Sequence, residues 1–358
     1  MGRMMGSTKP IRMWIDGKCF NIKKYKKLKK SSTSTCGSEE TPGTSTMCNH
    51  NFIINPTDNG KLTTTFRLPS IYYVRLNSFP NFSLKKLESE TNTEVSMPKN
   101  GNDGYIIVTG DNEIDVVNAR ETIQSVASEI REKQIAAQFI SIPVHSEEVQ
   151  RNFEQFKSEI LSGDPIQGVD GTIFQSSLKL HLTVVVFALM DNLEKSEAIT
   201  TLNDCKTEFI SPLLAETGPL KIKVSGIDCM NDNLEKVNVL YANAKVDHES
   251  GEDILQKLVN GISDYFYERG LVRQYQDNVK LHVTLINTKY RKSSAETSPV
   301  KKRSKWQMKK QTFDARSIME KYKDYYFGES VFDSVHLSYI SSKGEDGFYK
   351  PLSIIKVQ

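Results

Sequence analysis

An internal repeat limits the fold of this chain more than any other feature of its sequence. The segments LHLTV at 180–184 and LHVTL at 281–285 match residue type for residue type, and a lysine precedes each of them. Apolar and polar residues alternate in both copies, which is the pattern of a half-buried β-strand. The copies lie about 100 residues apart, too far for a solenoid repeat, so the sequence predicts one domain built of two related halves.

The repeat places an imidazole and a hydroxyl on one face of each strand. Because successive side chains point to opposite faces, His181 and Thr183 share a face, and Leu182 points to the other. The same holds for His282 and Thr284 in the second copy. If a pseudo-twofold axis relates the two halves, the two His-x-Thr pairs face each other across a groove.

Two imidazoles that face one groove suit phosphoryl transfer without a metal ion. An imidazole titrates near pH ~6.5, so at neutral pH one histidine can accept a proton while the other donates one. The acceptor deprotonates the attacking hydroxyl or water, the donor protonates the leaving oxygen, and the threonines donate hydrogen bonds to the non-bridging oxygens. A single histidine beside a threonine is usually structural, whereas a second matched copy favours catalysis. The predicted catalytic residues are His181, Thr183, His282 and Thr284.

The other histidines show no comparable pattern. His50, His145 and His248 lack the repeated context. His336, in the stretch VHLS, is interpreted as a strand residue, with a position lining the groove as the alternative. No group of Asp, Glu and His has the spacing of metal ligands. We therefore expect neither a metal ion nor an organic cofactor.

Cysteine use and hydropathy predict a soluble intracellular protein. The five cysteines are odd in number and no two stand as Cys-x-x-Cys, which argues against a disulfide framework or a zinc site. The N-terminus has no secretory segment, and no apolar run approaches the ~20 residues that span a bilayer. With 47 basic and 44 acidic residues, the net charge of +3 says little about partners. We expect the nucleus or the cytoplasm, and no membrane contact.

Composition divides the chain into three regions. Residues 1–60 are polar and expected to be largely disordered, apart from a short apolar motif at 11–20. Trp14 and Ile15 in that motif are candidates for binding a partner protein. Residues 61–137 and 138–358 are each patterned like a folded domain.

The region 61–137 predicts a compact α/β domain. Its apolar patterns predict, in chain order, a strand at 63–68, helices at 70–76 and 82–91, strands at 94–97 and 105–109, and a helix at 111–133. The last helix has an apolar face of Ile114, Val117, Ile123, Val126 and Ile130. The order β-α-α-β-β-α is that of a KH domain.

The region 138–358 alternates strands with helices. We expect strands at 139–143, 179–187, 220–226, 237–246, 279–287, 335–340 and 353–357, and helices at 147–161, 195–215 and 252–269. This alternation predicts an α/β or α+β fold in which helices pack on a sheet.

The paired motifs and the domain order resemble a known family. Paired His-x-Thr motifs in a bilobal α/β domain are the hallmark of the two-histidine, or LigT-like, phosphoesterases, and one branch carries a KH domain directly ahead of that domain. Stretches that support the resemblance are IDG at 15–17, KKLESETNT at 85–93, GIDCMN at 226–231, VLYA at 239–242 and YFG at 326–328. The resemblance spans nearly the whole chain outside 23–61.

The resemblance implies an activity and a setting. Relatives cleave RNA, 2′,5′-linked oligonucleotides or cyclic phosphates, and members of this branch act with a nucleic-acid helicase and an alkylation-damage demethylase in a nuclear coactivator complex. Residue by residue, only the histidines and threonines of the two motifs carry over, and all four are intact.

The presumed KH domain departs from its pattern at the nucleic-acid loop. KH domains clamp the backbone with a Gly-x-x-Gly loop, but here residues 78–81 read SFPN, without glycine or a basic residue. Glycine permits close backbone approach, and Pro80 removes an N–H donor. Three basic residues near the loop are candidates for weak, sequence-independent RNA binding, namely Arg75, Lys85 and Lys86.

A basic segment at 289–310 is the second candidate for RNA binding. It holds nine basic residues and one acidic residue, with Tyr290 and Trp306 among them. Cations beside an aromatic platform suit single-stranded RNA, although a solvated loop or a nuclear import signal fits the same pattern. The candidate residues are Lys289, Arg291, Lys292, Lys301, Lys302, Arg303, Lys305 and Trp306.

The sequence thus predicts a metal-independent RNA or nucleotide phosphodiesterase with an atypical KH domain and a helicase-containing partner complex. The alternative is an RNA-binding adaptor whose His-x-Thr groove holds a terminal or cyclic phosphate without turnover. Intact motifs favour the enzyme, but binding and catalysis need the same residues.

Overall fold

The computed structural model describes residues 11–15, 18–22, 52–99, 102–272, 275–291 and 312–357. The chain splits into two compact units, Met1–Asn49 and His50–Gln358. In the first unit, β1 (Ile11–Ile15) and β2 (Lys18–Ile22) pair antiparallel, with Trp14 opposite Cys19. The predicted apolar motif thus contains two paired strands, and its role in partner binding stays a prediction.

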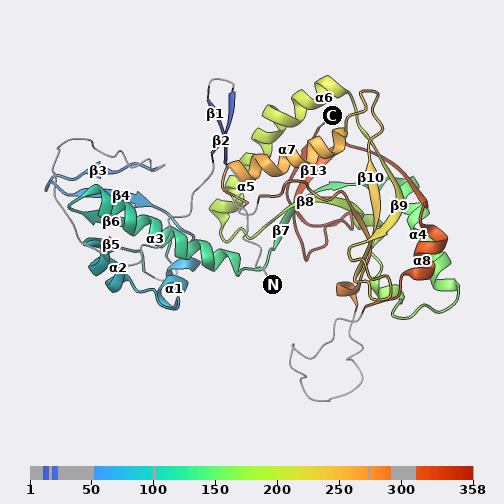
Figure 1. The fold of residues 1–358 in the computed structure, drawn as a ribbon, viewed down its shortest axis with the longest axis horizontal. Coiled ribbons are helices and arrows are strands. Elements are labelled where there is room, and N and C mark those ends of the chain that lie inside the picture. Colours follow the sequence, from blue (N-terminus) through green and yellow to red (C-terminus); the bar gives the residue numbers. More distant parts are fainter. Residues whose placement is uncertain are drawn as a thin grey trace, which may run out of the picture. The chain divides into compact units, whose positions relative to one another are not determined.

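The second unit begins with a small α/β region over residues 52–132. Its elements are β3 (Asn55–Pro56), β4 (Leu62–Phe66), α1 (Ile71–Asn77), α2 (Leu84–Thr91), β5 (Thr93–Ser96), β6 (Ile106–Gly110) and α3 (Glu113–Glu132). The strands form an antiparallel sheet of order β3-β4-β6-β5, against which α3 packs (Figure 1). Apart from the short strand β3, the elements follow the predicted order.

The buried face of α3 differs from the prediction in its first turn. Ile114 is 60% exposed, whereas Val116, Ala119 and Ile123 are fully buried. The helix begins at Glu113, where the side chain of Asn112 caps it by accepting a hydrogen bond from the Asp115 amide. From that start, the helical period turns 116, 119 and 123 toward the sheet and 114 toward solvent.

The rest of the unit is a larger α/β region. Its strands are β7 (Gln138–Pro143), β8 (His181–Phe187), β9 (Lys221–Cys229), β10 (Val239–Lys245), β11 (Val283–Asn287), β12 (Tyr326–Val331), β13 (Ser334–Tyr339) and β14 (Pro351–Lys356). Its α-helices are α4 (Glu147–Ser162), α5 (Asn192–Cys205), α6 (Ser211–Thr217), α7 (Ile254–Glu268) and α8 (Arg316–Tyr322). No helix among the described residues is long and apolar enough to cross a membrane.

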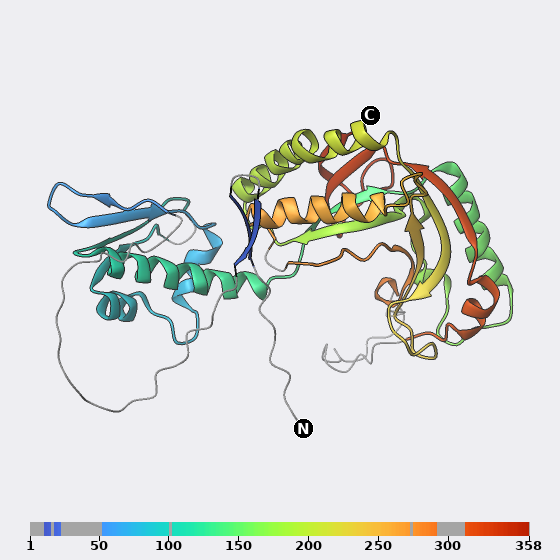
Figure 2. The ribbon, with the colours of Figure 1, turned by 45° about the horizontal axis from the view of Figure 1, so that its top comes forward.

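One eight-stranded antiparallel sheet organises this region, in the order β12-β9-β10-β11-β8-β7-β13-β14. The two repeat strands, β8 and β11, are therefore neighbours at its centre. Figure 2 shows α7 running alongside β8, and Leu182 and Val184 of this strand lie buried in the core to which α7 also contributes. The mixed α/β class predicted from the sequence is confirmed.

The structure corrects several predicted elements here. Strand β12 and helix α8 were not expected, and the helix predicted at 195–215 is α5, a π-helical turn at Lys206–Ile210 and α6. The strand predicted at 279–287 begins only at Val283. The backbone of Val279 bonds instead to side chains of α7, with its N–H donating to Asn260 and its carbonyl accepting from Gln256, so it is withdrawn from the sheet.

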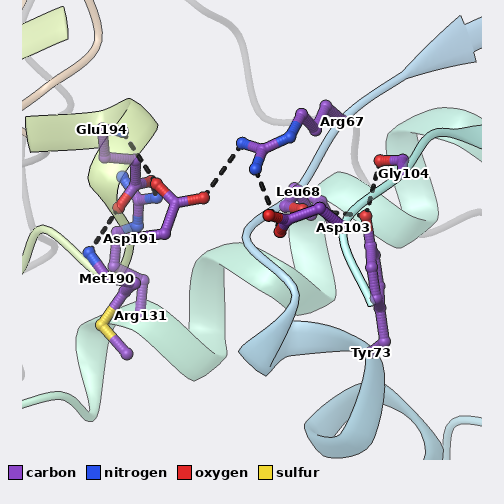
Figure 3. A network of polar contacts seen from close by, with 9 residues as sticks. All are labelled: Arg67, Leu68, Tyr73, Asp103, Gly104, Arg131, Met190, Asp191 and Glu194. Atoms are coloured by element: carbon purple, nitrogen blue, oxygen red, sulfur yellow. Dashed lines mark hydrogen bonds and ion pairs between the residues drawn. The ribbon is translucent and has the colours of Figure 1, made fainter. Parts of the chain in front are cut away.

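A polar network joins the small region to the larger one (Figure 3). Arg67, just after β4, lies 3.2 Å from Asp103 and 3.0 Å from Asp191, the residue that caps α5. At the end of α3, Arg131 pairs with Glu194, which also accepts a hydrogen bond from the Met190 amide at 2.7 Å.

Both ends of the Arg131–Glu194 pair are largely shielded from water, with side chains 19% and 12% exposed. The network therefore ties the small region to the start of α5, the helix that follows β8.

We predict that Glu194→Ala lowers the free energy of unfolding by about 3 kcal/mol, because it leaves Arg131 shielded and unpaired. The control is Glu90→Ala, which removes the exposed Lys86–Glu90 pair and should cost under about 0.5 kcal/mol. Urea denaturation of the full chain measures both. Equal, small losses for the two variants would contradict a structural role for the network.

Candidate active site

The two His-x-Thr motifs meet on adjacent strands. Strands β8 and β11 pair antiparallel with Leu182 opposite Val283. This register sets His181 across from Thr284 and Thr183 across from His282 on one face of the sheet. Leu182 and Val283, which point to the other face, are buried. The structure thus brings together the four residues that the sequence singled out.

Each imidazole is oriented by the backbone two residues before it. The Nδ1 atom of His181 lies 2.7 Å from the carbonyl oxygen of Lys179, and that of His282 lies 2.8 Å from the carbonyl oxygen of Lys280. A carbonyl oxygen only accepts, so Nδ1 carries the proton in both rings. Nε2 of each neutral ring is therefore an acceptor, and that of His181 lies 3.1 Å from the hydroxyl of Thr183.

The two histidines differ in their surroundings. The ring of His181 is enclosed by Phe139 and Tyr349, each with its centroid 5.3 Å away, and by Phe348 at 6.1 Å. This burial lowers the pKa of His181 to about 4, although the hydrogen bond to the Lys179 carbonyl opposes the shift. His181 is therefore neutral at physiological pH.

His282 is less enclosed. Its ring meets the edge of Tyr241 at a centroid distance of 5.9 Å. Desolvation also lowers the pKa of His282, and the charge of Lys280 adds to the shift.

The polar face continues beyond the motifs onto β7 and β13. Ser141 stands opposite Thr183, and His336 stands opposite Ser141. His336 is buried beneath Phe348, against which the ring of His145 also stacks. The sequence interpretation of His336 as a strand residue holds, and its strand adjoins the one that pairs with β8.

Only the start of the predicted basic segment is described. Lys289 is exposed, whereas the guanidinium of Arg291 pairs with Asp170 and donates to the carbonyl of Gly168 at 2.6 Å. Arg291 thus anchors the chain rather than projecting freely. The other candidates lie outside the described residues, namely Lys292, Lys301, Lys302, Arg303, Lys305 and Trp306.

The loop between α1 and α2 is compact. Phe79 packs on the core of the small region, and Asn81 has a left-handed backbone with φ of 64°. That conformation is easiest for glycine and tolerated by asparagine. Of the three cations predicted to bind RNA here, Lys85 and Lys86 are exposed and Arg75 is half-buried.

Sequence reasoning missed the aromatic residues around the histidines. Tyr241 could have been found, because strand alternation puts it on the polar face of β10, opposite Thr284. Tyr349 and Phe348 come from the segment before β14 and have no local pattern that points to the site. The same is true of Gln175, which donates to Tyr290 at 2.9 Å and to Tyr349 at 3.4 Å.

Across the described residues, no three His, Cys, Asp or Glu side chains are grouped to hold a metal ion. A metal-free reaction stays a prediction.

The sequence is similar to known proteins. Residues 137–357 match the family model described as the AKAP7 2′5′ RNA ligase-like domain. Activating signal cointegrator 1 complex subunit 1 of Mus musculus is 35% identical over 281 residues, which cover 76% of this chain and 78% of the mouse protein.

Two solved structures show a weaker likeness. The TT0787 protein of Thermus thermophilus is 13% identical, with a TM-score of 0.35, over 62% of this chain and 97% of its own. E. coli LigT complexed with 3′-AMP is 11% identical, with a TM-score of 0.34, over 63% and 99%.

The domain match defines the class: residues 137–357 form a 2′5′ RNA ligase-like, or LigT-like, domain. Within that class, the chain belongs to the family of activating signal cointegrator 1 complex subunit 1.

We predict that His181 titrates at a lower pH than His282 in the folded protein. Because the pKa of His181 falls from 6.5 to about 4 on folding, the unfolded chain binds more protons between these values. Stability should therefore fall as the pH drops from about 6.5 to about 4, and His181→Gln should reduce that fall. Denaturation across this range measures the effect, with His248→Gln, remote from the motifs, as control. An equal loss in wild type and His181→Gln would contradict the burial of a neutral imidazole.

Proposed function

We propose that this protein is a metal-independent phosphodiesterase that acts on RNA or a related nucleotide, with His181 as general base and His282 as general acid. One observation carries the proposal. Both histidines donate through Nδ1 to a backbone carbonyl, so both present Nε2 on the face shared with Thr183 and Thr284. Such convergence of two oriented imidazoles is what general acid–base catalysis requires.

The surroundings suggest which histidine takes which role. Because burial lowers the pKa of His181 to about 4, this imidazole is neutral, and its Nε2 can accept the proton of the attacking hydroxyl or water. His282 must be protonated on Nε2 to donate to the leaving oxygen. A bound phosphodiester carries a negative charge, and a nearby anion raises the pKa of an imidazole and favours that protonated state.

Residues of the site can take up and supply the two protons that the cleavage reaction transfers. The attacking oxygen forms a bond to phosphorus and gives its proton to His181, while the bond from phosphorus to the leaving oxygen breaks. His282 supplies the proton that the leaving oxygen takes up. The hydroxyls of Thr183 and Thr284 donate hydrogen bonds to the non-bridging oxygens as charge develops on them.

The alternative is an adaptor that holds a terminal or cyclic phosphate without cleaving it. The lowered pKa of His282 favours this alternative, because the free protein then has little of the acid form at neutral pH. The two functions differ in turnover and not in binding, so an activity assay separates them.

We further propose that residues 61–137 form a KH domain. We also propose that the protein binds single-stranded RNA as a subunit of the activating signal cointegrator complex, beside its helicase subunit, in the nucleus and the cytoplasm. The element order of this region and the relationship to the mouse subunit support this assignment. The compact α1–α2 loop offers no glycine for close backbone approach, so we assign most of the RNA affinity to the basic segment at 289–310.

We predict that His181→Ala and His282→Ala each lower turnover roughly 10²–10⁴-fold while the fold is kept. The two side chains act as a unit, so the double variant should be little worse than either single one. Substrates with 2′,5′, 3′,5′ and 2′,3′-cyclic linkages should be assayed in EDTA across pH.

Wild-type activity should survive EDTA and follow a bell-shaped pH profile, because one histidine must be neutral and the other charged. Ser330→Ala, a buried position on the edge strand β12, provides a control for general damage to the sheet. Near wild-type rates in either histidine variant, or activity that EDTA abolishes and Mg²⁺ restores, would show that the assigned acid–base pair is wrong.

We predict that neutralising Lys301, Lys302, Arg303 and Lys305 weakens binding to single-stranded RNA and makes its salt dependence shallower by up to ~3 in log–log slope. The comparison variant replaces Ser78 and Asn81 with glycine. It should bind at least as tightly as wild type, because position 81 already has a left-handed backbone. Binding would be measured over a salt series, and an unchanged affinity and slope in the first variant would leave the segment without a role in RNA binding.

A further inference from the structure

At each proposed catalytic histidine, one tyrosine ring contacts both the histidine and a lysine. The ammonium of Lys179 lies 4.4 Å from the ring centroid of Tyr349, and that of Lys280 lies 4.5 Å from the ring centroid of Tyr241. The same two rings meet the histidines nearly perpendicularly, His181 at 5.3 Å and 83°, and His282 at 5.9 Å and 80°. The site therefore contains the same Lys–Tyr–His arrangement twice.

The sequence repeat does not account for this match. Tyr241 lies on β10, the outer neighbour of β11, and the equivalent neighbour of β8 is β7. At the positions that face His181 and Thr183, however, β7 carries Pro143 and Ser141. Tyr349 comes instead from the segment before β14, at the edge of the sheet. Two non-equivalent elements thus place a tyrosine ring against the corresponding lysine and histidine of each repeat.

The two lysines also lack acidic partners. Among the described residues, no carboxylate lies within ion-pair distance of Lys179 or Lys280. Lys179 donates to the carbonyl of Ser342 at 2.7 Å, which anchors its side chain without neutralising it. On the Tyr241 side, the carboxylate of Asp228 accepts a hydrogen bond from the Tyr241 hydroxyl at 2.8 Å. Two cations without an ion-pair partner beside two imidazoles make this part of the sheet attractive to an anion.

We propose that Lys179 and Lys280 bind the non-bridging oxygens of the substrate phosphate, one from each half of the site, and that Tyr349 and Tyr241 position them. This inference rests on the proposed function only in that the site receives a phosphate ester; it does not require turnover. A lysine ammonium is a compact charge on a flexible stem, which suits the contact of one oxygen without fixed bidentate geometry.

The same charges give a second readout. Lys179 and Lys280 each lower the pKa of the histidine two residues on, so their removal should raise it. The other titratable groups that face these imidazoles are His145 and Tyr349 for His181, Tyr241 for His282, and the two histidines for each other. None of them changes in a lysine variant. Under the proposed mechanism, loss of Lys179 moves the limb of the pH–rate profile that His181 sets to higher pH, and loss of Lys280 does the same to the limb that His282 sets.

The test uses the full chain with Lys179→Met or Lys280→Met. The control is Lys321→Met, whose ammonium lies 4.9 Å from the ring of Tyr322 on α8, away from the motifs. The probe is uridine 3′-monophosphate, and the imidazole resonances of His181 and His282 report both its binding and their pKa values. Each site variant should bind the probe roughly tenfold more weakly. Each should also raise the pKa of its own histidine, while the control matches wild type.

Arginine in place of Lys179 or Lys280 should restore part of the affinity for the probe, because it retains the positive charge. Tyr241→Leu should weaken binding of the probe although Lys280 is still present. If wild type binds the probe but cleaves no substrate, the enzyme proposal fails and this one stands. Unchanged affinity and histidine pKa values in the folded methionine variants would overturn it. Failure of wild type to bind the probe would overturn it as well.

Discussion

The antiparallel pairing of β8 with β11 is the contact on which the site depends. With Leu182 opposite Val283, the apolar side chains of both repeats enter one core, and the two His-x-Thr pairs emerge together on the other face. A shift of this register by one residue would bury the imidazoles and expose the leucines, so the hydrophobic core itself specifies the catalytic geometry. Leu182 itself is buried, and α7 packs against β8.

Backbone carbonyls and aromatic rings complete the geometry. The carbonyls of Lys179 and Lys280 fix the tautomer of each imidazole, which directs both Nε2 atoms away from the strands. The two imidazoles then differ in how many aromatic rings surround them. Phe139, Phe348 and Tyr349 surround His181. Among the described rings, Tyr241 alone contacts His282. Two motifs of the same His-x-Thr pattern can in this way serve as a base and an acid.

The sequence predicted what depends on local pattern. Strand alternation in the two repeats was enough to place His181, Thr183, His282 and Thr284 on one face, and helical periodicity was enough to locate α4 and α7. It could not predict that β8 and β11 are direct neighbours, because pairing between strands about 100 residues apart depends on the whole sheet. Tyr349 could not be predicted either, because it reaches His181 from the far edge of the sheet.

Local rules failed where tertiary contacts took over the backbone. The strand predicted from Val279 was shortened because Asn260 and Gln256 of α7 bond its N–H and carbonyl. The first turn of α3 exposes Ile114 because the helical period of 3.6 residues places it roughly half a turn out of phase with the buried Ile123.

The central claim is that His181 acts as the base and His282 as the acid in phosphodiester cleavage. The most direct measurement compares cleavage of an RNA dinucleotide with that of its analogue carrying sulfur at the leaving position, because a thiolate leaves without protonation. With the sulfur analogue, His282→Ala should cleave at nearly the wild-type rate, whereas His181→Ala should stay impaired. Equal rescue of both variants, or of neither, would contradict the assignment.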